Sequence, residues 1–278
     1  MAILQATGLS RVYGEDRGAT TWALRDASLT VEAGDFIGVM GPSGSGKTTL
    51  LNLLAAIDTP TSGTVEINGI ALSKLSDRDL AIFRRRNLGF VFQDYNLLHT
   101  LSIQENVVLP LALDNMEPTA ILVRLRQVAA QIGIAPILDK RVFQVSGGEQ
   151  QRAAIARAII HRPSLILADE PTGNLDSKSS ASVMKALSDL NAWATVVPGA
   201  GPSAGRSADS NTASSATILM VTHDPFAASF CRRILFIKDG RIHSELHRTG
   251  SRQAFFQEIL RALTAQGGGD FDFAAARA

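Results

Sequence analysis

Cysteine is nearly absent from this sequence of 278 residues, since Cys231 stands alone. One cysteine can build neither a disulfide framework nor a cysteine-ligated zinc site within a chain. An excess of one charge is also lacking, because 27 Lys and Arg residues face 26 Asp and Glu residues and leave a formal net charge of +1. Such a chain has no broad basic field for a phosphate backbone, so we expect no nucleic-acid partner.

Long hydrophobic runs are missing as well. The longest apolar segments, such as residues 50–57 and 107–113, fall far short of the ~20 residues that a membrane-spanning helix needs. The first ten residues lack the basic start and apolar stretch of a signal peptide. We therefore expect a soluble chain that would act at a membrane only through another polypeptide. Apolar residues make up 45% of the chain, which is ordinary for a globular protein.

What is present is an alternation of strands and helices. Short apolar segments predict strands and amphipathic segments predict helices, in an order typical of a mostly parallel sheet covered on both faces. The predicted strands are residues 3–8, 23–31, 35–40, 63–68, 88–93, 164–169, 216–221 and 233–237. The predicted helices are residues 47–57, 76–86, 102–113, 119–131, 147–161, 176–192 and 224–230.

The same pattern of predicted elements divides the chain into parts. Residues 2–245 are predicted to form one domain, in which about 94–145 lack any strand pattern and form a helical subdomain. Residues 193–215 are rich in Gly, Ala and Ser and predict a flexible insertion. Residues 246–264 are expected to be a helical extension, and residues 265–278 a disordered tail.

A complete phosphate-binding loop stands between a predicted strand and a predicted helix. Its glycines let backbone N–H groups face an anion, and the helix N-terminus adds a partial positive charge. Lys47 is expected to reach the β- and γ-phosphates, and the Thr48 hydroxyl to ligate Mg²⁺. The predicted nucleotide-binding residues here are Gly41, Pro42, Ser43, Gly44, Ser45, Gly46, Lys47, Thr48 and Thr49.

Two carboxylates lie at the end of the buried strand 164–169, at the edge where ligands gather in open α/β sheets. Asp169 is predicted to hold Mg²⁺, directly or through water. Glu170 is then placed to orient or deprotonate an attacking water. Beside a phosphate-binding loop, this pair predicts Mg²⁺-dependent hydrolysis of a nucleoside triphosphate, and the family resemblance described next implies that the nucleotide is ATP.

The segment Ser146-Gly147-Gly148-Glu149-Gln150-Gln151-Arg152 resembles the signature sequence of ATP-binding cassette (ABC) proteins. It stands just upstream of the Asp169 strand, as that family expects. Further motifs follow the family's order. Tyr13 resembles the aromatic residue that stacks on adenine, Gln93 the Q-loop glutamine, Gly173-Asn174-Leu175-Asp176 the D-loop, and His223 the switch histidine. The resemblance covers roughly residues 2–245.

This resemblance implies an α/β P-loop NTPase fold with a mostly parallel core sheet, an N-terminal antiparallel β subdomain and a helical subdomain. It implies that Gln93, Thr48 and Asp169 arrange Mg²⁺, that Glu170 activates water and that His223 stabilises the γ-phosphate. It also implies a head-to-tail dimer of two ABC chains, expected to be identical. Ser146, Gly147 and Gly148 would serve the partner's ATP through a bare helix N-terminus, and Glu149 and Asp176 are further expected nucleotide-binding residues.

Plainer interpretations stay open for single residues. Tyr13 is also explained as an aromatic residue at a strand end. His223 is also explained as a satisfied core or capping histidine. Ser146 is also explained as a simple helix cap.

A finer likeness lies in residues 84–113 and 220–242 and in the Phe255-Phe256 segment. They resemble the branch of macrolide exporters, lipoprotein-release systems and cell-division-type permeases, most of all the bacitracin and antimicrobial-peptide resistance cassettes. That likeness implies an integral-membrane permease partner, with this chain at the cytoplasmic face of the cell membrane. Lipoprotein release and macrolide export are alternatives within the branch. A soluble ABC ATPase acting on DNA or ribosomes is a distant one.

Two expectations follow about parts of the chain outside the motifs. Leu97, Leu98, Leu101 and Ile103 are candidates to line a permease groove in the helical subdomain, with packing inside that subdomain as the equal alternative. The insertion 193–215 lies on a helix-to-strand connection, opposite the strand ends that bind ATP. We therefore expect it not to touch the nucleotide, and we expect deletion of residues 195–213 to leave ATP turnover within a few-fold.

Overall fold

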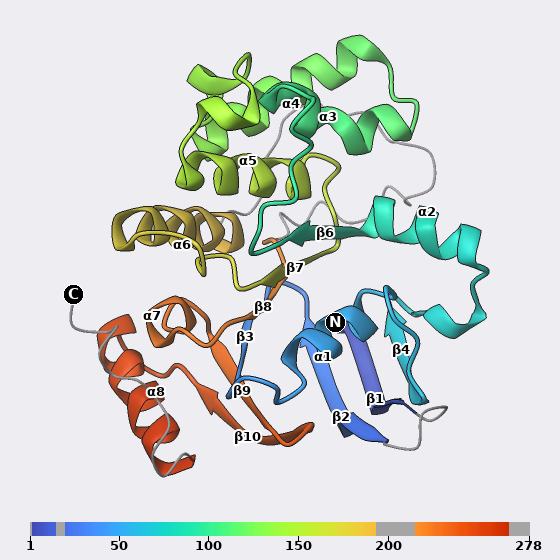
Figure 1. Cartoon of the computed structure of the whole chain (residues 1–278), viewed down its shortest axis with the longest axis vertical. Coiled ribbons are helices and arrows are strands. Elements are labelled where there is room, and N and C mark those ends of the chain that lie inside the picture. Colours follow the sequence, from blue (N-terminus) through green and yellow to red (C-terminus); the bar gives the residue numbers. More distant parts are fainter. Residues whose placement is uncertain (1, 15–19, 193–214, 267–278) are drawn as a thin grey trace.

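The computed structural model describes residues 2–14, 20–192 and 215–266, and its strands gather in two sheets (Figure 1). The first sheet is antiparallel in the order β2-β1-β4-β5, built from β1 (Ala2–Tyr13), β2 (Thr21–Glu32), β4 (Ser62–Ile67) and β5 (Ile70–Ala71). The second is the core sheet, in the order β10-β9-β3-β8-β7-β6. Its strands are β3 (Phe36–Met40), β6 (Leu88–Val91), β7 (Leu165–Asp169), β8 (Ile218–Val221), β9 (Arg233–Lys238) and β10 (Arg241–His247). Its strands run parallel except for β10, which is antiparallel to β9.

The helices surround this core sheet, and α3, α4 and α5 gather above it in Figure 1. They are α1 (Lys47–Leu54), α2 (Asp77–Asn87), α3 (Ile103–Leu113), α4 (Pro118–Ile132), α5 (Gly147–Ile159), α6 (Ser177–Ala192), α7 (Pro225–Ala228) and α8 (Arg252–Gln266). Short 3₁₀ turns occupy η2 (Leu72–Lys74), η3 (Ala135–Ile137) and η4 (Val142–Gln144). Across the described ranges, no helix combines the length and apolar character that crossing a bilayer requires.

Strand β3 shows why the strands of the core sheet are continuous apolar segments in the sequence. All five of its residues are buried. Phe36 and Met40 point into a cluster that includes residues of α3 to α8, whereas Ile37 and Val39 point into a second cluster with α1 and the antiparallel sheet. Both faces of the core sheet are therefore covered, which is the condition under which parallel strands lose their polar alternation.

Strand β10 was not predicted, although its signal was present. It pairs with β9 through a tight turn at Asp239-Gly240, where both residues have positive φ (50° and 75°). An Asp-Gly pair between two alternating segments is a strong hairpin signal. The half-exposed alternation of Arg241–His247 is typical of a sheet edge.

The expected boundary between residues 245 and 246 falls inside β10. Helix α8 begins at Arg252 and buries Phe255, Ile259 and Leu263 in the same core cluster as α3 to α7. The expected extension is therefore an integral part of the described fold. The helix reaches Gln266, and the remainder of the predicted tail lies outside the described residues.

The predicted insertion, apart from residue 215, also lies outside the described residues. Its flanks are fixed, because the Asn191 side-chain amide donates to the carbonyl oxygens of Gly34 and Ala216 at 2.8 Å each. Gly34 precedes β3, so both flanks lie at the N-terminal ends of the core strands. The phosphate-binding loop lies at their C-terminal ends.

Candidate nucleotide-binding site

The phosphate-binding loop joins β3 to α1, as its motif predicted. Lys47, the first residue of α1, is nearly buried. Its Nζ donates to the carbonyl oxygens of Gly41 at 2.9 Å and Pro42 at 2.8 Å. Burial lowers the pKa of Lys47, while the nearby charges of Glu170 and Asp169 oppose that shift. The ammonium group is therefore held at the loop, close to both carboxylates.

Two glycines of this loop allow the backbone to be approached closely. A Cβ at Gly41 would lie 2.1 Å from the Ile237 carbonyl oxygen, and one at Gly46 would lie 2.2 Å from the Ala23 carbonyl oxygen. Gly46 also has a φ of 100°, a conformation that side chains disfavour. As the N-cap of α1, Gly46 supplies no side-chain oxygen to the first N–H groups. Ser45 Oγ is buried and finds no partner among the described residues.

The end of β7 brings two carboxylates to this loop. Asp169 Oδ1 is buried and unpartnered within the part of the chain that the structure describes. Burial, followed by the charge of Glu170, raises the pKa of Asp169. Glu170 has a φ of 44°, and its N–H donates to the Val221 carbonyl oxygen at 2.9 Å. A non-glycine residue in this left-handed region is strained, and such strain concentrates at functional sites.

His223 lies beside Glu170. Its Nδ1 is 2.9 Å from Glu170 Oε2. Their hydrogen bond raises the pKa of His223 and lowers the pKa of Glu170. Strand β8 positions this histidine, because the N–H of Thr222 donates to the Val39 carbonyl oxygen. Lys47, Asp169, Glu170 and His223 thus converge at the C-terminal ends of β3, β7 and β8.

Gln93 lies against the D-loop segment. Its Nε2 donates to Asn174 Oδ1 at 3.3 Å, and Asn174 Nδ2 donates to Asp94 Oδ1 at 2.8 Å. A Cβ at Gly173 would lie 3.1 Å from the Gln93 side chain. Asp176 lies at the start of α6, where its carboxylate accepts from the N–H groups of residues 178 and 179. Its contacts here are those of a helix cap.

The N-terminus of α5 is capped, so the expectation of a bare helix end is wrong. Ser146 Oγ accepts from the N–H of Glu149 at 3.4 Å, and the N–H of Ser146 donates to Glu149 Oε2 at 2.8 Å. This is a capping box, the plainer interpretation that the sequence left open. The two glycines fit closely, since a Cβ at Gly147 would lie 2.9 Å from the Tyr95 hydroxyl and one at Gly148 2.8 Å from Ser179 Oγ.

Gln151 is a residue that the sequence reasoning missed. Its side chain is fully buried, and its Nε2 donates to the carbonyl oxygens of Phe92 at 3.2 Å and Pro171 at 2.7 Å. It therefore ties α5 to the segments that follow β6 and β7. The nearest signal was its position inside the signature segment, because nothing local to a glutamine predicts burial.

Tyr13 ends β1 and is exposed. Its hydroxyl donates to Asp58 Oδ2 at 2.7 Å, and the Arg11 guanidinium lies 4.7 Å from its ring centre. One face of the ring is thus covered by a cation. The structure therefore anchors this ring at both its hydroxyl and one face.

The donor set at the strand ends suits Mg²⁺. The structure contains, within its described ranges, no cluster of three or more His, Cys, Asp or Glu residues that would hold a metal by protein groups alone. Mg²⁺ in nucleotide sites takes one or two protein oxygens and completes its shell with phosphates and water. The unpartnered Asp169 oxygen and the hydroxyl of Thr48, second residue of α1, are such ligands.

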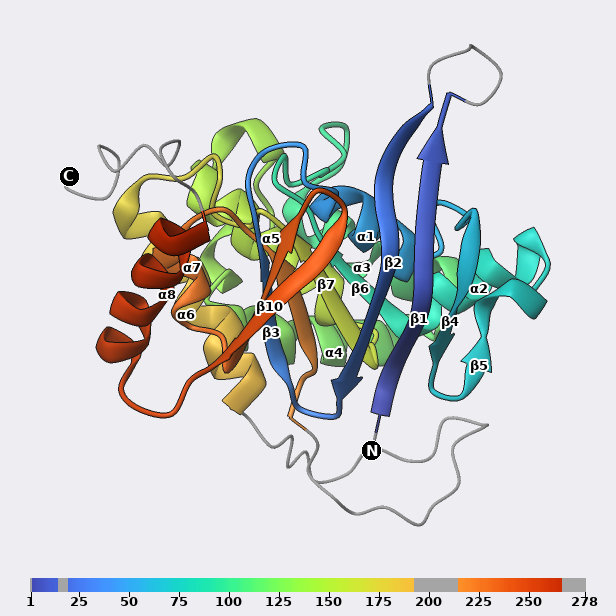
Figure 2. The same cartoon turned by 90° about the horizontal axis from the view of Figure 1, so that it is seen from below.

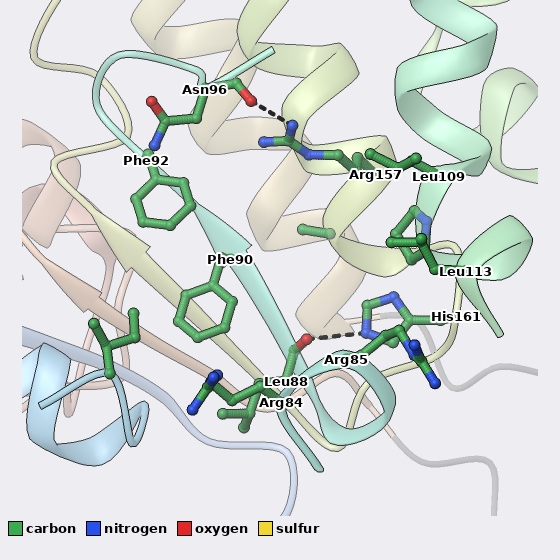
Figure 3. A pocket seen from close by; sticks show the side chains of 13 residues that line it. Arg84, Arg85, Leu88, Phe90, Phe92, Asn96, Leu109, Leu113, Arg157 and His161 are labelled. Atoms are coloured by element: carbon green, nitrogen blue, oxygen red, sulfur yellow. Dashed lines mark hydrogen bonds between the residues drawn. The ribbon is translucent and has the colours of Figure 1, made fainter. Parts of the chain in front are cut away.

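A groove of about 380 Å³ lies between α2, β6, α3 and α5 (Figure 3). It is lined by Ile57, Arg84, Arg85, Leu88, Phe90, Phe92, Asn96, Leu109, Pro110, Leu113, Arg157, Ala158 and His161. Of the four residues predicted to line a permease groove, Leu97 and Ile103 are buried in the core, so that role is wrong for them. Leu98 and Leu101 do not line the groove described here, and their role stays a prediction. Packing within the helical subdomain accounts for Leu97 and Ile103.

Comparisons with known proteins agree with this geometry. Residues 24–173 match the family model described as ABC transporter. The chain is 54% identical to the uncharacterized ABC transporter ATP-binding protein YvcR of Bacillus subtilis, over 98% of each protein. It is 44% identical to the bacitracin export ATP-binding protein BceA of Halalkalibacterium halodurans, over 96% of this chain and 98% of that protein.

A solved structure shares the fold. It is the dimeric post-hydrolysis state of the ATP-binding cassette MJ0796 bound to ADP and Pi, with a TM-score of 0.74 and 35% identity over 89% of this chain and 99% of that one. The predicted fold class is therefore confirmed, and so is the resemblance stated from the motifs. The chain belongs to the ABC transporter family, as an ATP-binding subunit with ATPase activity.

Proposed function

We propose that this subunit hydrolyses Mg²⁺-ATP in a head-to-tail dimer of identical chains and thereby drives an integral-membrane permease that acts on antimicrobial peptides. The observation that carries the catalytic part is the convergence of Lys47, Asp169, Glu170 and His223 at the ends of three neighbouring strands. The peptide part is supported by 44% identity to a bacitracin export ATP-binding protein.

The loop residues bind the nucleotide. Lys47 exchanges its two carbonyl acceptors, Gly41 and Pro42, for phosphate oxygens, and the first N–H groups of α1 add further donors. Thr48, Asp169 and Gln93 hold Mg²⁺, which neutralises phosphate charge when it is bound. Adenine stacks on the face of Tyr13 opposite Arg11.

Glu170 and His223 divide the chemistry between them. The lowered pKa keeps Glu170 ionised, so that it can orient a water and accept its proton. The raised pKa favours a protonated His223, which can donate a hydrogen bond to the γ-phosphate. The histidine side chain is 62% exposed, which leaves it room to turn from Glu170 toward a phosphate.

The partner chain completes each site. Ser146 is exposed at the N-terminus of α5, and the N–H groups of Gly147 and Gly148 begin that helix. These groups, with neighbouring Glu149 and the D-loop Asp176, face the ATP of the second copy. The dimeric arrangement of MJ0796, at 35% identity, supports this pairing.

The groove of Figure 3 receives the permease. Phe90, Leu109 and Leu113 supply an apolar floor, and Arg84 and Arg157 lie at its sides. Arginine side chains beside an apolar floor suit an amphipathic helix that carries a carboxylate. We therefore assign this groove to a helix on the cytoplasmic side of the permease, which holds the subunit at that face of the membrane.

The Glu170→Gln variant tests the catalytic assignment. The amide keeps the shape of the side chain but cannot accept a proton, so we expect steady-state phosphate release to fall at least about 100-fold. Binding of ATP should persist, and size-exclusion chromatography with Mg²⁺-ATP should show a dimer. Phosphate release at the wild-type rate would refute the role of Glu170. A chain that stays monomeric with ATP bound would refute the composite site.

A pair of surface variants tests the groove. Tagged Glu170→Gln protein, with Mg²⁺-ATP, is used to capture partners from detergent-solubilised membranes of the source cells. We expect mass spectrometry to identify a polytopic permease. Leu113→Glu should abolish that capture, because it places a charged carboxylate in the apolar floor of the groove. Val123→Glu is the matched control, since Val123 is 57% exposed on α4 outside the groove. Equal capture by both variants would place the permease elsewhere.

A further inference from the structure

One helical turn follows the switch histidine directly. Asp224 caps α7, since its carboxylate accepts from the N–H of Phe226 at 2.8 Å and from that of Ala227 at 3.2 Å. Helix α7 spans only Pro225–Ala228. A helix this short has too few internal hydrogen bonds to be stable alone, so its position depends on what packs against it.

Helix α8 packs on this turn through an arginine. The Arg252 guanidinium lies 4.2 Å from the ring centre of Phe230 and 5.5 Å from that of Phe226. The two rings meet edge to face, with centres 5.4 Å apart at 75°. Arg252 thus holds an aromatic pair whose first member lies within α7 and whose second lies two residues beyond it. Such cation–π contacts favour a single arrangement of the two rings.

The arginine stands on a fixed support. Phe255, Ile259 and Leu263, spaced four residues apart, are at most 3% exposed and belong to the core cluster that also contains Ala227 and Ala228. Figures 1 and 2 show α8 lying alongside α7 at one end of the core sheet. A second tie runs from Arg248, whose Nη1 donates to the Phe230 carbonyl oxygen at 3.5 Å.

We propose that α8 is a positioning element for the switch histidine, and that Arg252 is the residue through which it acts. The inference rests on the proposed role of His223 in hydrolysis. Arg252 holds Phe226 and Phe230, these rings hold α7, and α7 continues directly from Asp224 and His223. Loss of the arginine leaves ATP bound but lets the histidine sample positions away from the γ-phosphate.

The kinetics of Arg252 variants test this proposal in the full chain. We expect Arg252→Ala to lower kcat for ATP about 3- to 10-fold, in line with the strength of a cation–π contact, while KM changes less than about 2-fold. Arg252→Lys should recover most of kcat, because an ammonium group also binds aromatic faces. Arg261→Ala is the matched control, since Arg261 is exposed on the same helix. Arg252→Met keeps the apolar stem and serves if the alanine variant fails to fold.

Two further measurements separate positioning from general stability. Nitrogen-15 NMR spectra of the histidine imidazole rings should show a shifted or broadened His223 signal in Arg252→Ala. The His223 signal should be unchanged in Arg261→Ala. In a His223→Ala background, Arg252→Ala should cause no further loss of kcat. A lower melting temperature with unchanged kcat and unchanged His223 signals would overturn the proposal, as would an equal loss in the His223→Ala background. Full activity of His223→Ala alone would instead refute the proposed role of His223.

Discussion

Helices α1 and α5 have similar sequences at their N-termini, but their N-termini are capped differently. Helix α1 begins after Ser45-Gly46, and α5 begins at Gly147, directly after Ser146. In α5 the serine and Glu149 close a capping box, which pairs the N–H groups of Ser146 and Glu149 within the chain. In α1 the N-cap is a glycine in a left-handed conformation, and Ser45 Oγ is buried without a partner in the described chain.

This difference in capping suggests that the N-terminus of α1 binds a ligand and that the N-terminus of α5 faces a partner chain. The N–H groups of α1, with Lys47 beside them, form an anion-binding end that a phosphate completes. The end of α5 is already stable, so it offers a phosphate only the N–H groups that its cap leaves uncovered. We therefore expect the first helix end to bind the chain's own nucleotide and the second to face the partner chain.

The largest expected effect comes from adding a methyl group at one glycine of the phosphate-binding loop that precedes α1 and at the first residue of α5. Gly41→Ala places a Cβ 2.1 Å from a backbone carbonyl oxygen, which cannot move without displacing β9. We expect a loss of about 2 kcal/mol or more in unfolding free energy and no measurable ATP binding. Gly147→Ala places its Cβ against the Tyr95 hydroxyl, the far end of a side chain that can rotate. Its loss should stay below about 1 kcal/mol.

Chemical denaturation and titration calorimetry with ATP measure both variants. Similar losses of unfolding free energy in Gly41→Ala and Gly147→Ala would contradict the proposed difference between the phosphate-binding loop and the start of α5. Normal ATP affinity in a folded Gly41→Ala variant would show that the close approach of the Ile237 carbonyl to Gly41 does not shape the phosphate-binding loop.

The same two helix ends show what sequence alone can predict. The position of the phosphate-binding loop between β3 and α1 was predicted correctly, because eight adjacent positions specify the motif and its flanks are local. The cap of α5 was misread as bare, although Ser146 and Glu149 stand three residues apart, as a capping box requires. The two glycines that follow Ser146 suggest an open helix end, whereas the spacing of Ser146 and Glu149 predicts the cap that the structure shows.

Residues that depend on tertiary packing were not predictable from local pattern. The contact of Glu170 with His223 joins two strands that are far apart in sequence, and no spacing rule encodes it. Leu97 and Ile103 were candidates for a groove because they are apolar, but the core contains them. Gln151 carries no mark of burial, since its partners are backbone carbonyls of two distant segments.

A smaller effect is expected from removing the cap of α5. Ser146→Ala leaves the N–H of Glu149 without its acceptor, so we expect a loss of about 1 kcal/mol in unfolding free energy. Affinity of the monomer for ATP should not change, because the cap serves α5 alone. Ser76→Ala is a matched control, since Ser76 caps α2 through the N–H of Asp79. A larger loss of monomer ATP affinity for Ser146→Ala than for Ser76→Ala would erase the distinction between the two helix ends.

The smallest effect is a pH dependence of opposite sign at the two ends. The hydrogen bond from the Ser146 backbone lowers the pKa of Glu149, so its contribution to stability is present above the unfolded pKa and is lost as pH falls through the folded value. Burial raises the pKa of Asp169 beside α1, so ionising it costs stability, and the cost is relieved as pH falls through its raised pKa.

Substitution by the matching amide separates these two contributions. At pH 7 without nucleotide, Asp169→Asn should melt about 1 to 2 °C higher than the wild type, because it removes a buried charge. Glu149→Gln should melt about 1 °C lower, because a neutral acceptor holds the Ser146 N–H more weakly. Near pH 4 the Asp169 difference should shrink because the raised pKa lets that carboxylate take up a proton, whereas more of the Glu149 difference should remain because its pKa is lowered. Scanning calorimetry at the two pH values measures this. A lower melting temperature for Asp169→Asn at pH 7 would mean that the Lys47 charge outweighs burial, and that the end of α1 is held by its own ion pairs as α5 is by its cap.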